Sequence, residues 1–470
     1  MRGLLSYGSH VPVGRLSRSL VGGKPGSRSI AWHDENTTSM GVEAARAALR
    51  AAPRAVVGSL LFSTANPAYL DKTNAVAIHA ALGLPADAAA YDLLGSVRSA
   101  VGAIRLAAEH ADGPPALVVL ADIRTGRSGS TDERDGGDGA AALVIGDERD
   151  GPLLAEIEAF GSASAEFLDR WRLPGELGSR VWEERFGEQA YVPLVEQAVA
   201  DACKAAGITP DDLGIVVTAG LHGRAIRSAV QACGLSAAAA GDDLAAVIGN
   251  TGSAAPGLAI IDALERAEAG ARIALVSVAD GADVIILRAA GLASERATAV
   301  PLRAQLDRGR DVDYQTYLTW RGALEREPPR RPDPERPAAP PAARRAEWKY
   351  AFVGSRCTAC GTRHLPPQRS CIHCGAVDEM VGEPIADVLG TVATFTIDHL
   401  AYSLSPPMVV AAVDFGGGGR FQCELTDVDP TQVRIGDRVE MTFRCLFTAG
   451  GVHNYFWKAR PAHPRPDDAV

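Results

Sequence analysis

Four of the chain's eight cysteines stand in two C-x-x-C pairs that ten residues separate: Cys357 and Cys360, then Cys371 and Cys374. The two thiolates of such a pair can bind one metal ion, so two pairs supply four sulfur ligands and leave no open coordination position. A closed tetrahedral sulfur site is structural, and zinc is the metal that it favours. The spacing therefore predicts a structural Zn²⁺ site, with the neighbouring His364 and His373 outside the ligand set.

The composition limits the class of protein that could carry this site. A chain of 470 residues is too long for one hydrophobic core, so two or three domains are expected. Its 47% hydrophobic and 22% charged residues are typical of a soluble globular protein, and its net charge of -10 argues against nucleic-acid or anionic-membrane partners. Neither a membrane helix nor a signal-peptide apolar core is evident. We expect a cytoplasmic protein, in which paired cysteines bind metal rather than form disulfides.

Composition also predicts where the domains begin and end. Residues 327–345 are rich in proline, arginine and alanine and lack apolar periodicity, which is typical of a linker. Upstream, short Val/Ile/Leu runs alternate with alanine-rich helical stretches, as in an α/β domain with buried strands. Downstream the pattern is mostly β, with five alternating segments after the cysteines. The predicted division is an α/β domain at 1–290, a helical connector at 291–326, the linker at 327–345, a zinc ribbon at 346–380, a β-barrel at 381–462 and a tail at 463–470.

The α/β region contains an apparent internal duplication. ALVVLAD at 116–122 is followed by GDGAAALVIG at 137–146, and IALVSVAD at 273–280 by GADVIILR at 281–288. Both copies have the order strand, acidic turn, small residues, strand, which predicts two copies of one α/β unit. The aromatic and charged residues 166–208 lie between the copies and are expected to form a mostly helical insertion that covers a site.

Five segments of this region resemble the thiolase superfamily: YDLLGSVRSAVGAIRLA, GDGAAALVIG, SAEFLDRWR, WEERF and VIGNTGSAAPGLAIIDALE. Within that superfamily they are most similar to condensing enzymes of the 3-hydroxy-3-methylglutaryl-CoA synthase and ketoacyl synthase III type. The resemblance implies a duplicated five-layer α/β fold, acyl-CoA binding and a homodimer. It also implies a cysteine nucleophile at a helix start, where free N–H groups and the helix dipole lower a thiol pKa.

The family's reactive residues do not carry over intact. In the family pattern the cysteine follows an aspartate by five residues, and Asp92 plus five is Val97, so the nucleophile is absent. Ser96 beside it could accept an acyl group if a base removed its proton, or could simply cap the helix. The family's glutamate position falls near Ala65 and Asn66, which cannot supply that role.

Two further family positions are partly preserved. The family's histidine is expected near residue 218, and His222 lies a few residues later, either reaching a site from its loop or exposed to solvent. Asn250 in GNTGSAAPG matches the family's asparagine, whose amide could donate a hydrogen bond to a thioester oxygen. The alternative for Asn250 is an Asn-Thr-Gly turn that starts the next helix.

The C-terminal region has its own resemblance. CTACGTRHLPPQRSCIHCG and the β segments after it resemble the zinc-ribbon plus OB-fold proteins that accompany thiolases and condensing enzymes on acyl-CoA. This resemblance implies a five-stranded OB-fold barrel behind the ribbon.

Three functional hypotheses remain open. The first is a non-nucleophilic, acyl-CoA-binding subunit that acts with a thiolase subunit in carbon-carbon bond formation or cleavage. The second is a cysteine-independent retro-aldol lyase, for which Tyr69, Asp92 and His222 are the groups to test. The third is a serine-dependent acyltransferase that uses Ser96.

Overall fold

The computed structural model describes residues 2–110, 113–235, 243–291, 300–327, 332 and 334–463. It divides into two compact units, and the division does not follow one boundary along the chain. The larger unit comprises Met1–Ala31, Glu43–Val76 and Ala86–Tyr317; the smaller comprises Trp32–Val42, Ala77–Pro85 and Leu318–Val470. The boundaries expected along the sequence therefore stay predictions, and both the linker and the tail lie partly outside the described residues.

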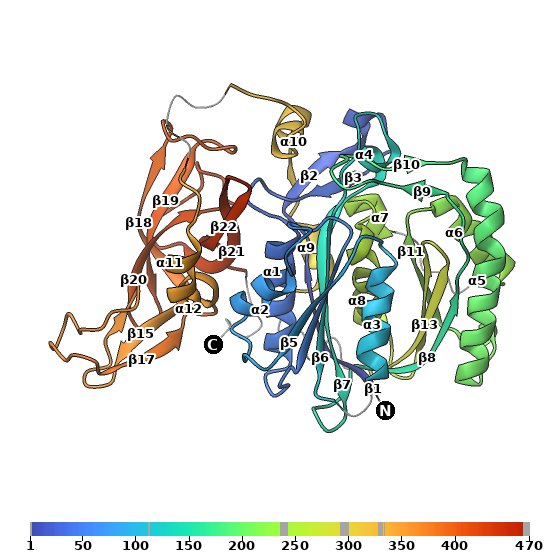
Figure 1. Cartoon of the computed structure of the whole chain (residues 1–470), viewed down its shortest axis with the longest axis horizontal. Coiled ribbons are helices and arrows are strands. Elements are labelled where there is room, and N and C mark those ends of the chain that lie inside the picture. Colours follow the sequence, from blue (N-terminus) through green and yellow to red (C-terminus); the bar gives the residue numbers. More distant parts are fainter. Residues whose placement is uncertain are drawn as a thin grey trace. The chain divides into compact units, whose positions relative to one another are not determined.

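The larger unit is built on a nine-stranded mixed sheet in the order β11-β12-β13-β8-β1-β7-β6-β4-β5 (Figure 1). Its first half comprises β1 (Arg2–His10), β4 (Ser59–Thr64), β5 (Ala89–Leu94), β6 (Ala116–Ile123) and β7 (Asp138–Asp147). Its second half comprises β8 (Ala155–Ala163), β11 (Ile215–Gly220), β12 (Arg272–Val278) and β13 (Ala282–Ala289).

The predicted duplication is confirmed by the pairing of these strands. In the first half β4 runs parallel to β6, and β6 runs antiparallel to β7. In the second half β11 runs parallel to β12, and β12 runs antiparallel to β13. The two halves join where β1 pairs with β8.

Helices cover the two halves to give five layers, as Figure 1 shows. Helices α3 (Ser99–Glu109) and α8 (Ala255–Arg266) share one buried apolar core with strands of both halves. Helix α1 (Thr37–Ala51) packs through its C-terminal part on β1, while α5 (Glu184–Ala206) and α6 (Gly223–Ala232) share a second core with β8 and β11–β13. The expected duplicated five-layer α/β architecture is therefore confirmed.

One pair of glycines repeats between the halves. A Cβ on Gly8 of β1 would lie 2.2 Å from the carbonyl oxygen of Ala44 on α1. A Cβ on Gly161 of β8 would lie 1.9 Å from the carbonyl oxygen of Ala198 on α5. Neither helix backbone could approach its strand so closely over a larger residue, so glycine sets the same helix-to-strand contact twice.

Shorter elements complete the larger unit. Strands β2 (Gly14–Ser17), β3 (Ser27–Ile30) and β14 (Arg310–Asp311) form a small sheet, and β9 (Arg170–Trp171) pairs with β10 (Arg180–Val181). The remaining elements are η1 (Arg18–Val21), α4 (Thr131–Asp135), η2 (Pro210–Asp212), α7 (Asp243–Ile248), η3 (Gly252–Ala254) and α9 (Leu302–Leu306). Helices α2 (Ala75–Ala81) and α10 (Tyr314–Trp320) extend into segments of the smaller unit. Within the described residues, no helix has the length and apolar character that crossing a membrane requires.

The smaller unit contains a three-stranded ribbon and a closed five-stranded barrel, as predicted. The ribbon comprises β15 (Val353–Cys357), β16 (Arg363–His364) and β17 (Met380–Pro384), preceded by α11 (Ala339–Arg344) and α12 (Ala346–Ala351). The barrel comprises β18 (Gly390–Asp398), β19 (Met408–Phe415), β20 (Arg420–Leu425), β21 (Arg438–Ala449) and β22 (Val452–Pro461). Buried aromatic residues hold it together, among them Phe352, Phe443 and Trp457.

A buried ion-pair network joins the barrel to the segment 32–42. Arg444, which is 0% exposed, has Nη1 3.0 Å from Asp34 and 3.1 Å from Glu35, and its Nη2 lies 2.5 Å from Asp427. The Nζ of Lys458 lies 3.0 Å from the other oxygen of Asp34. Both cations are desolvated, so the carboxylate of Asp34, which is 1% exposed, is a buried counter-charge of two barrel residues.

Candidate functional site

A cavity of about 130 Å³ lies in the larger unit at the carboxyl ends of five strands: β4, β5, β6, β11 and β12. The residues that follow these strands, Ala65, Gly95, Arg124, Leu221 and Ala279, all line the cavity. Ligands of open α/β sheets commonly bind at this end of the strands, where the loops diverge. The duplicated fold thus brings equivalent strand ends of its two halves around one small space.

The turn from β5 into α3 forms one wall of this cavity. Val97, the position matched to the family's cysteine, is 7% exposed and packs with Ala65 and Ala279. Gly95 has φ +100°, and a Cβ built on it would meet no heavy atom within 4 Å. Gly95, Ser96 and Val97 all line the cavity, and neither the glycine nor the valine offers a nucleophile.

Ser96 is the one hydroxyl on this turn. Its Oγ donates a hydrogen bond to the Asp280 carboxylate at 2.8 Å and accepts one from the Arg98 backbone N–H at 3.2 Å. The second bond is typical of a hydroxyl near a helix start. Among the described side chains no histidine bonds to Ser96, so the hydroxyl lacks the base that would activate it.

The chain's cysteines lie elsewhere. Cys203 on α5 and Cys233 after α6 pack in or against the second apolar core, and burial raises the pKa of both thiols. The other six belong to residues 357–445 of the ribbon and barrel. No cysteine is among the residues that line the cavity.

His222 and Tyr191 line the cavity from the second half of the fold. Nδ1 of His222 accepts a hydrogen bond from the Ala225 backbone N–H at 3.2 Å, so a neutral ring carries its proton on Nε2 and can donate there. The Tyr191 hydroxyl bonds to Asp169, and burial is the main cause that raises its pKa. The sequence-predicted His222 is therefore at the cavity, whereas Tyr191 was not foreseen.

Three other predicted residues are engaged away from the lining. Asn250 donates through Nδ2 to the Gly220 carbonyl oxygen at 2.5 Å, and its Oδ1 accepts from the Gly252 N–H at 2.9 Å. The Asp92 carboxylate accepts hydrogen bonds from the backbone N–H groups at positions 74 and 75, at the start of α2. Asn250, Asp92 and Tyr69 are not among the residues that line the cavity, and their catalytic roles stay predictions.

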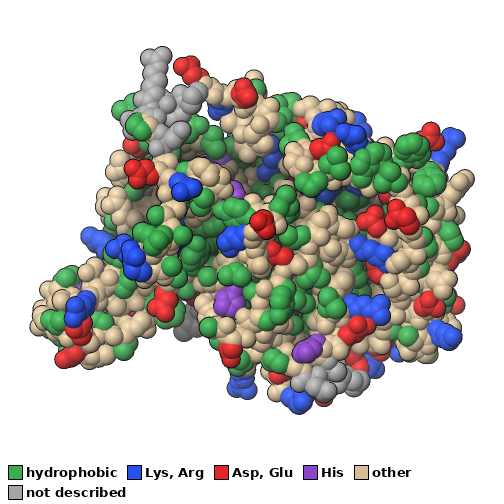
Figure 2. Space-filling view, viewed as in Figure 1, with side chains coloured by type: hydrophobic (Ala, Val, Ile, Leu, Met, Phe, Trp, Pro, Cys, Tyr) green, Lys and Arg blue, Asp and Glu red, His purple; other side chains and the backbone are tan. Residues whose placement is uncertain are grey.

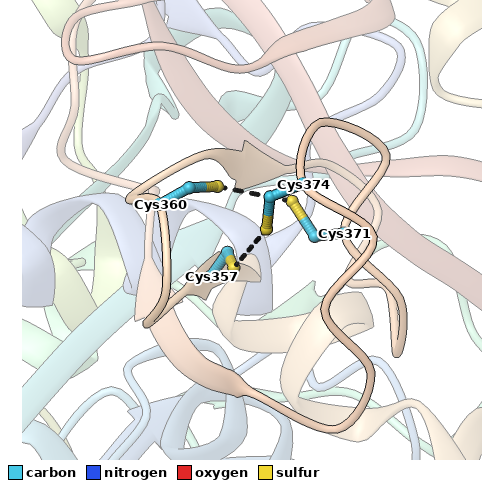
Figure 3. Close-up of side chains that lie close together, drawn as sticks. All are labelled: Cys357, Cys360, Cys371 and Cys374. Carbon is cyan, nitrogen blue, oxygen red and sulfur yellow. Dashed lines mark hydrogen bonds between the residues drawn. The ribbon is translucent and has the colours of Figure 1, made fainter.

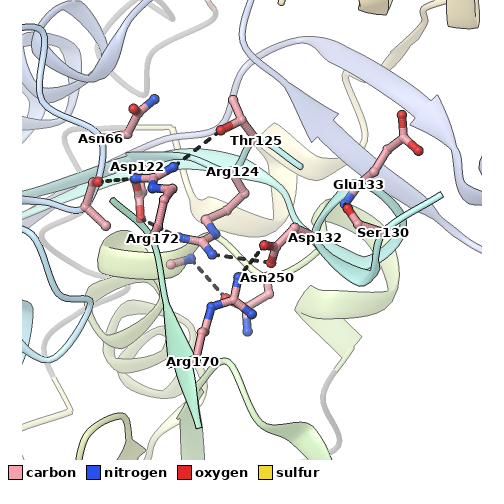
Figure 4. A network of polar contacts seen from close by, with 12 residues as sticks. Asn66, Asp122, Arg124, Thr125, Ser130, Asp132, Glu133, Arg170, Arg172 and Asn250 are labelled. Carbon is pink, nitrogen blue, oxygen red and sulfur yellow. Dashed lines mark hydrogen bonds and ion pairs between the residues drawn. The ribbon is translucent and has the colours of Figure 1, made fainter. Parts of the chain in front are cut away.

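Three arginines also line the cavity: Arg124, Arg170 and Arg172. Figure 4 shows Arg124 and Arg170 at Asp132. Arg124 Nη2 lies 3.4 Å from one Asp132 oxygen, and Arg170 Nη2 pairs with the other. Arg172 instead donates to the Ala65 carbonyl oxygen at 2.6 Å. Arg170 and Arg172 come from the predicted insertion, where the run DRWR could have indicated them. No pattern in the sequence predicts that Arg124 lies beside them.

The segment that carries Arg170 and Arg172 also has an apolar exterior. Its exposed residues include Leu173, Leu177, Val181 and Trp182, and Figure 2 shows hydrophobic side chains gathered over β9 and β10. The insertion therefore does line a cavity, as predicted, but it does so through a short hairpin. The long helix α5 of the same insertion packs on the sheet instead.

A larger, more open hollow of about 1240 Å³ lies at the other end of the strands. Its lining includes Leu5 and the proline pair 114–115. Two of its arginines are neutralised, because Arg149 pairs with Asp147 and Arg288 with Glu156. The smaller cavity, with its less completely paired polar groups, is the better candidate for chemistry.

The four ribbon cysteines converge in the smaller unit (Figure 3). Their Sγ atoms all lie within 4.8 Å of one another, with Cys357 and Cys374 at 3.7 Å and Cys360 and Cys371 at 3.5 Å. Four thiolates at ~2.3 Å from a tetrahedral zinc ion would be about 3.8 Å apart, so the arrangement fits the predicted metal.

Both C-x-x-C loops use the same turn. Gly361 and Gly375, with φ of 77° and 76°, donate their N–H to the carbonyl oxygens of Cys357 and Cys371 at 2.8 and 3.0 Å. A residue with a side chain rarely adopts this backbone, so glycine fixes both turns. His364 and His373 are outside the group of converging ligands.

Comparisons with known proteins fit this architecture. Residues 349–379 match the family model "ChsH2, rubredoxin-like zinc ribbon domain", and residues 384–444 match "ChsH2, C-terminal OB-fold domain". Hydroxymethylglutaryl-CoA synthase of Methanothermobacter thermautotrophicus is 28% identical over 69% of this chain and 99% of its own length. That of Aeropyrum pernix is 29% identical over 68% of this chain and 94% of its own.

Solved structures agree on the fold. A hydroxymethylglutaryl-CoA synthase complexed with CoA has a TM-score of 0.60 at 18% identity, over 68% of this chain and 89% of that one. The 3-oxoacyl-[acyl-carrier-protein] synthase III of Aquifex aeolicus has a TM-score of 0.53 at 18% identity, over 61% of this chain and 100% of that one.

Proposed function

From a chain that joins a hydroxymethylglutaryl-CoA synthase-like domain of the thiolase superfamily to ChsH2-type zinc-ribbon and OB-fold domains, we propose an acyl-CoA-binding, non-nucleophilic subunit. The larger unit binds the acyl part of a CoA thioester at the strand-end cavity and forms no acyl-enzyme. Carbon-carbon bond formation or cleavage then requires a partner that bears a cysteine, a thiolase subunit. The larger unit forms a homodimer, as symmetric assembly is the common state of such folds.

The observation that carries this proposal is the cavity wall at residues 95–97. Glycine, serine and valine occupy these three lining positions, no cysteine lines the cavity, and the Ser96 hydroxyl bonds to Asp280 and a backbone N–H rather than to a histidine. What the cavity does offer is side chains that can donate hydrogen bonds, among them His222 and the arginines. Donors of this kind orient and polarise a thioester carbonyl without attacking it.

The ribbon contributes structure rather than chemistry in this proposal. Cys357, Cys360, Cys371 and Cys374 hold Zn²⁺ with no position open for substrate. Bound zinc supplies the folding free energy that three short ribbon strands cannot supply by burial.

Retro-aldol cleavage is the second candidate, because it needs proton transfer and an oxyanion donor but no acyl-enzyme. The presence of His222 and Tyr191 on one cavity favours it. A serine acyltransferase is less well supported, because Ser96 bonds to Asp280 and to a backbone N–H rather than to a histidine.

Acyl transfer from radiolabelled acetyl-CoA, followed by denaturing separation, tests the proposal. We expect no covalent label on the wild type, because valine at position 97 has no lone pair and the Ser96 hydroxyl lacks a base. We expect label on Val97→Cys if the cavity binds the thioester. Gly95→Cys tests another lining position, at the cost of a strained backbone.

Gln231→Cys, on the exposed end of α6, is the control for nonspecific thiol acylation. Label on the wild type that disappears in Ser96→Ala would overturn the non-nucleophilic proposal in favour of a serine enzyme. Co-purification of a cysteine-bearing thiolase with the tagged chain would support the proposed partner, and condensing activity of the isolated chain would contradict it.

A further inference from the structure

The turn between β12 and β13 brings a carboxylate to the cavity. Asp280 lies in this turn, lines the cavity and is exposed. Its φ is +48° and that of Gly281 is +137°, and Asp-Gly is a favoured pair in tight hairpin turns. Asparagine or glycine at position 280 would suit this backbone equally well. The turn therefore explains the backbone of Asp280, but it does not explain what the carboxylate does.

Asp280 is held in place by residues outside its own hairpin. Its Oδ2 accepts a hydrogen bond from Ser96 Oγ at 2.8 Å, and its carbonyl oxygen accepts one from Arg98 Nη1 at 2.6 Å. Its backbone N–H donates to the Tyr191 hydroxyl at 3.2 Å. Ser96 is itself fixed, because its Oγ accepts from the Arg98 backbone N–H at 3.2 Å. These contacts orient the carboxylate at the cavity.

The charge of this carboxylate is not used in an ion pair within the described residues. Arg98, which bonds to the backbone of Asp280, pairs with Asp283 instead, with Nε 2.8 Å from Oδ2. The second carboxylate oxygen of Asp280, Oδ1, accepts no hydrogen bond from the part of the chain that the structure describes. Ser96 thus orients one oxygen, and the other is available to accept a proton.

The cavity also contains a hydrogen-bond donor that lacks a partner. Arg124 lines the cavity and is 5% exposed, yet its Nε has no hydrogen-bond partner in the described structure. A buried donor without a partner is costly, so such a group usually faces a ligand or a water. One cavity therefore combines an oriented carboxylate with donors suited to an oxyanion, Arg124 and His222.

We propose that Asp280 is a catalytic base that takes a proton from Cα of the bound acyl-CoA, the carbon next to the thioester carbonyl. The Cα–H bond breaks, the proton passes to Oδ1, and the electron pair moves to the thioester carbonyl oxygen as an enolate. Carboxylates remove such protons where donors stabilise the enolate oxygen. This inference rests on the proposed acyl-CoA function, and it assigns to this chain the carbanion that carbon-carbon bond formation needs.

Deuterium exchange into acetyl-CoA tests this inference without a partner, because the enolate takes up deuterium when Cα is reprotonated in D₂O. Acetyl has the smallest acyl group with protons at Cα, which suits a cavity of about 130 Å³. The zinc-loaded full chain is incubated with acetyl-CoA, and mass spectrometry follows deuterium in the methyl group. We expect faster exchange than in buffer alone. Asp280→Asn should lower the rate at saturating acetyl-CoA about 100-fold or more, the usual contribution of a positioned base.

A free carboxylate distinguishes a base from a residue that only shapes the turn. Asp280→Gly suits the left-handed backbone and leaves room for formate, which should restore exchange in proportion to its concentration. Asp211→Asn is the matched control, because Asp211 is an exposed aspartate of η2 that does not line the cavity. It should exchange acetyl-CoA at the rate of the wild type.

Undiminished exchange in Asp280→Asn, or a loss in Asp280→Gly that formate does not repair, would overturn the role of Asp280. A wild type that binds acetyl-CoA in isothermal titration but does not exchange it would also overturn that role, and the proposed acyl-CoA binding would stand. A wild type that binds no acetyl-CoA would reject both.

Discussion

Arg444 in the barrel is fully buried and Arg172 at the cavity is half-buried, and their surroundings differ. All three nitrogens of the Arg444 guanidinium are bonded, to Asp34, Glu35, Asp427 and Thr442. Arg172 is satisfied by one carbonyl oxygen and one distant hydroxyl. Saturation of a buried charge indicates a structural role, whereas incomplete pairing on a cavity wall indicates a place for a ligand.

The same contrast distinguishes the zinc ribbon, which could bind a metal ion, from the cavity, which could bind a ligand. The ribbon brings four cysteines together and needs only an ion to complete the set. The cavity brings together groups that lack partners of their own, including the Arg124 Nε. If this comparison is correct, removing a group from the smaller unit should cost stability, and removing one from the cavity should cost binding.

The largest effect is expected at the ribbon. Cys371→Ser removes one of four ligands, and zinc sites of this kind bind with about 10–16 kcal/mol. We expect loss of about one zinc per protomer and unfolding of residues 346–380, measured by metal analysis and by hydrogen exchange. His373→Ala, at a position outside the converging ligands, should keep the metal. Stoichiometric zinc in Cys371→Ser would contradict the assigned ligand set.

The next largest effect is expected in the buried network. Asp34→Asn removes the buried carboxylate that Arg444 and Lys458 share and leaves each cation with its other carboxylates, so we expect a loss of up to about 3–5 kcal/mol, the cost of removing one partner of a buried pair. Hydrogen exchange in β21 and β22 measures this loss locally. Asp414→Asn breaks an exposed pair with Arg420, with exposures of 47% and 64%, and should cost less than ~1 kcal/mol. Equal losses of stability in Asp34→Asn and Asp414→Asn would contradict the distinction between buried, fully bonded ion pairs and exposed ones.

The contribution of the Asp34 carboxylate to stability should depend on pH. Burial opposes ionisation of Asp34, but Lys458 and Arg444 outweigh it and hold the pKa of Asp34 well below its usual range. Because this pKa is lower in the folded state, the stabilisation is complete above about pH 5 and decreases as pH falls below the ordinary value of about 4. The difference in unfolding free energy between wild type and Asp34→Asn should therefore be constant from pH 7 to about 5 and shrink below pH 4.

The smallest stability effect is expected at the cavity. Arg172→Gln should change the free energy of unfolding by less than ~1 kcal/mol, because it breaks no ion pair in the described structure and relieves repulsion with Arg124. Urea titration of the full chain measures it. A loss as large as that of Asp34→Asn would mean that Arg172 is structural and would weaken the comparison itself.

Local patterns in the sequence predicted the parts of the molecule that depend on neighbours in the chain. The C-x-x-C spacing predicted the cysteine cluster, and the repeated strand-turn-strand segments predicted the duplicated sheet. The segments that resemble the condensing enzymes led to the correct family resemblance, whereas His222, for which the sequence left a site and an exposed loop open, lines the cavity only in the folded structure. The cysteine cluster, the duplication and the resemblance follow from periodicity and short spacing, which a single sequence contains.

The parts that escaped prediction depend on contacts between distant residues. Arg124 follows β6 and Arg172 lies in a hairpin, and only the folded sheet brings both to one wall. Asp34 lies in the α/β region of the sequence, yet its partners belong to the barrel strands. Asn250 was predicted from its motif, but its amide bonds to Gly220, a backbone contact that no motif reveals.

The Asp34–Arg444 contact spans 410 positions of the chain, which has a consequence for biosynthesis. At translation rates of about 5–20 residues per second, Asp34 leaves the ribosome roughly 20–80 s before Arg444 is made. Throughout that interval residues 32–42 cannot form their ion pairs with the barrel strands, even if the sheet of the larger unit has already formed. A nascent chain stalled before β21 should therefore keep this segment accessible to protease, and release of the full-length chain should protect it.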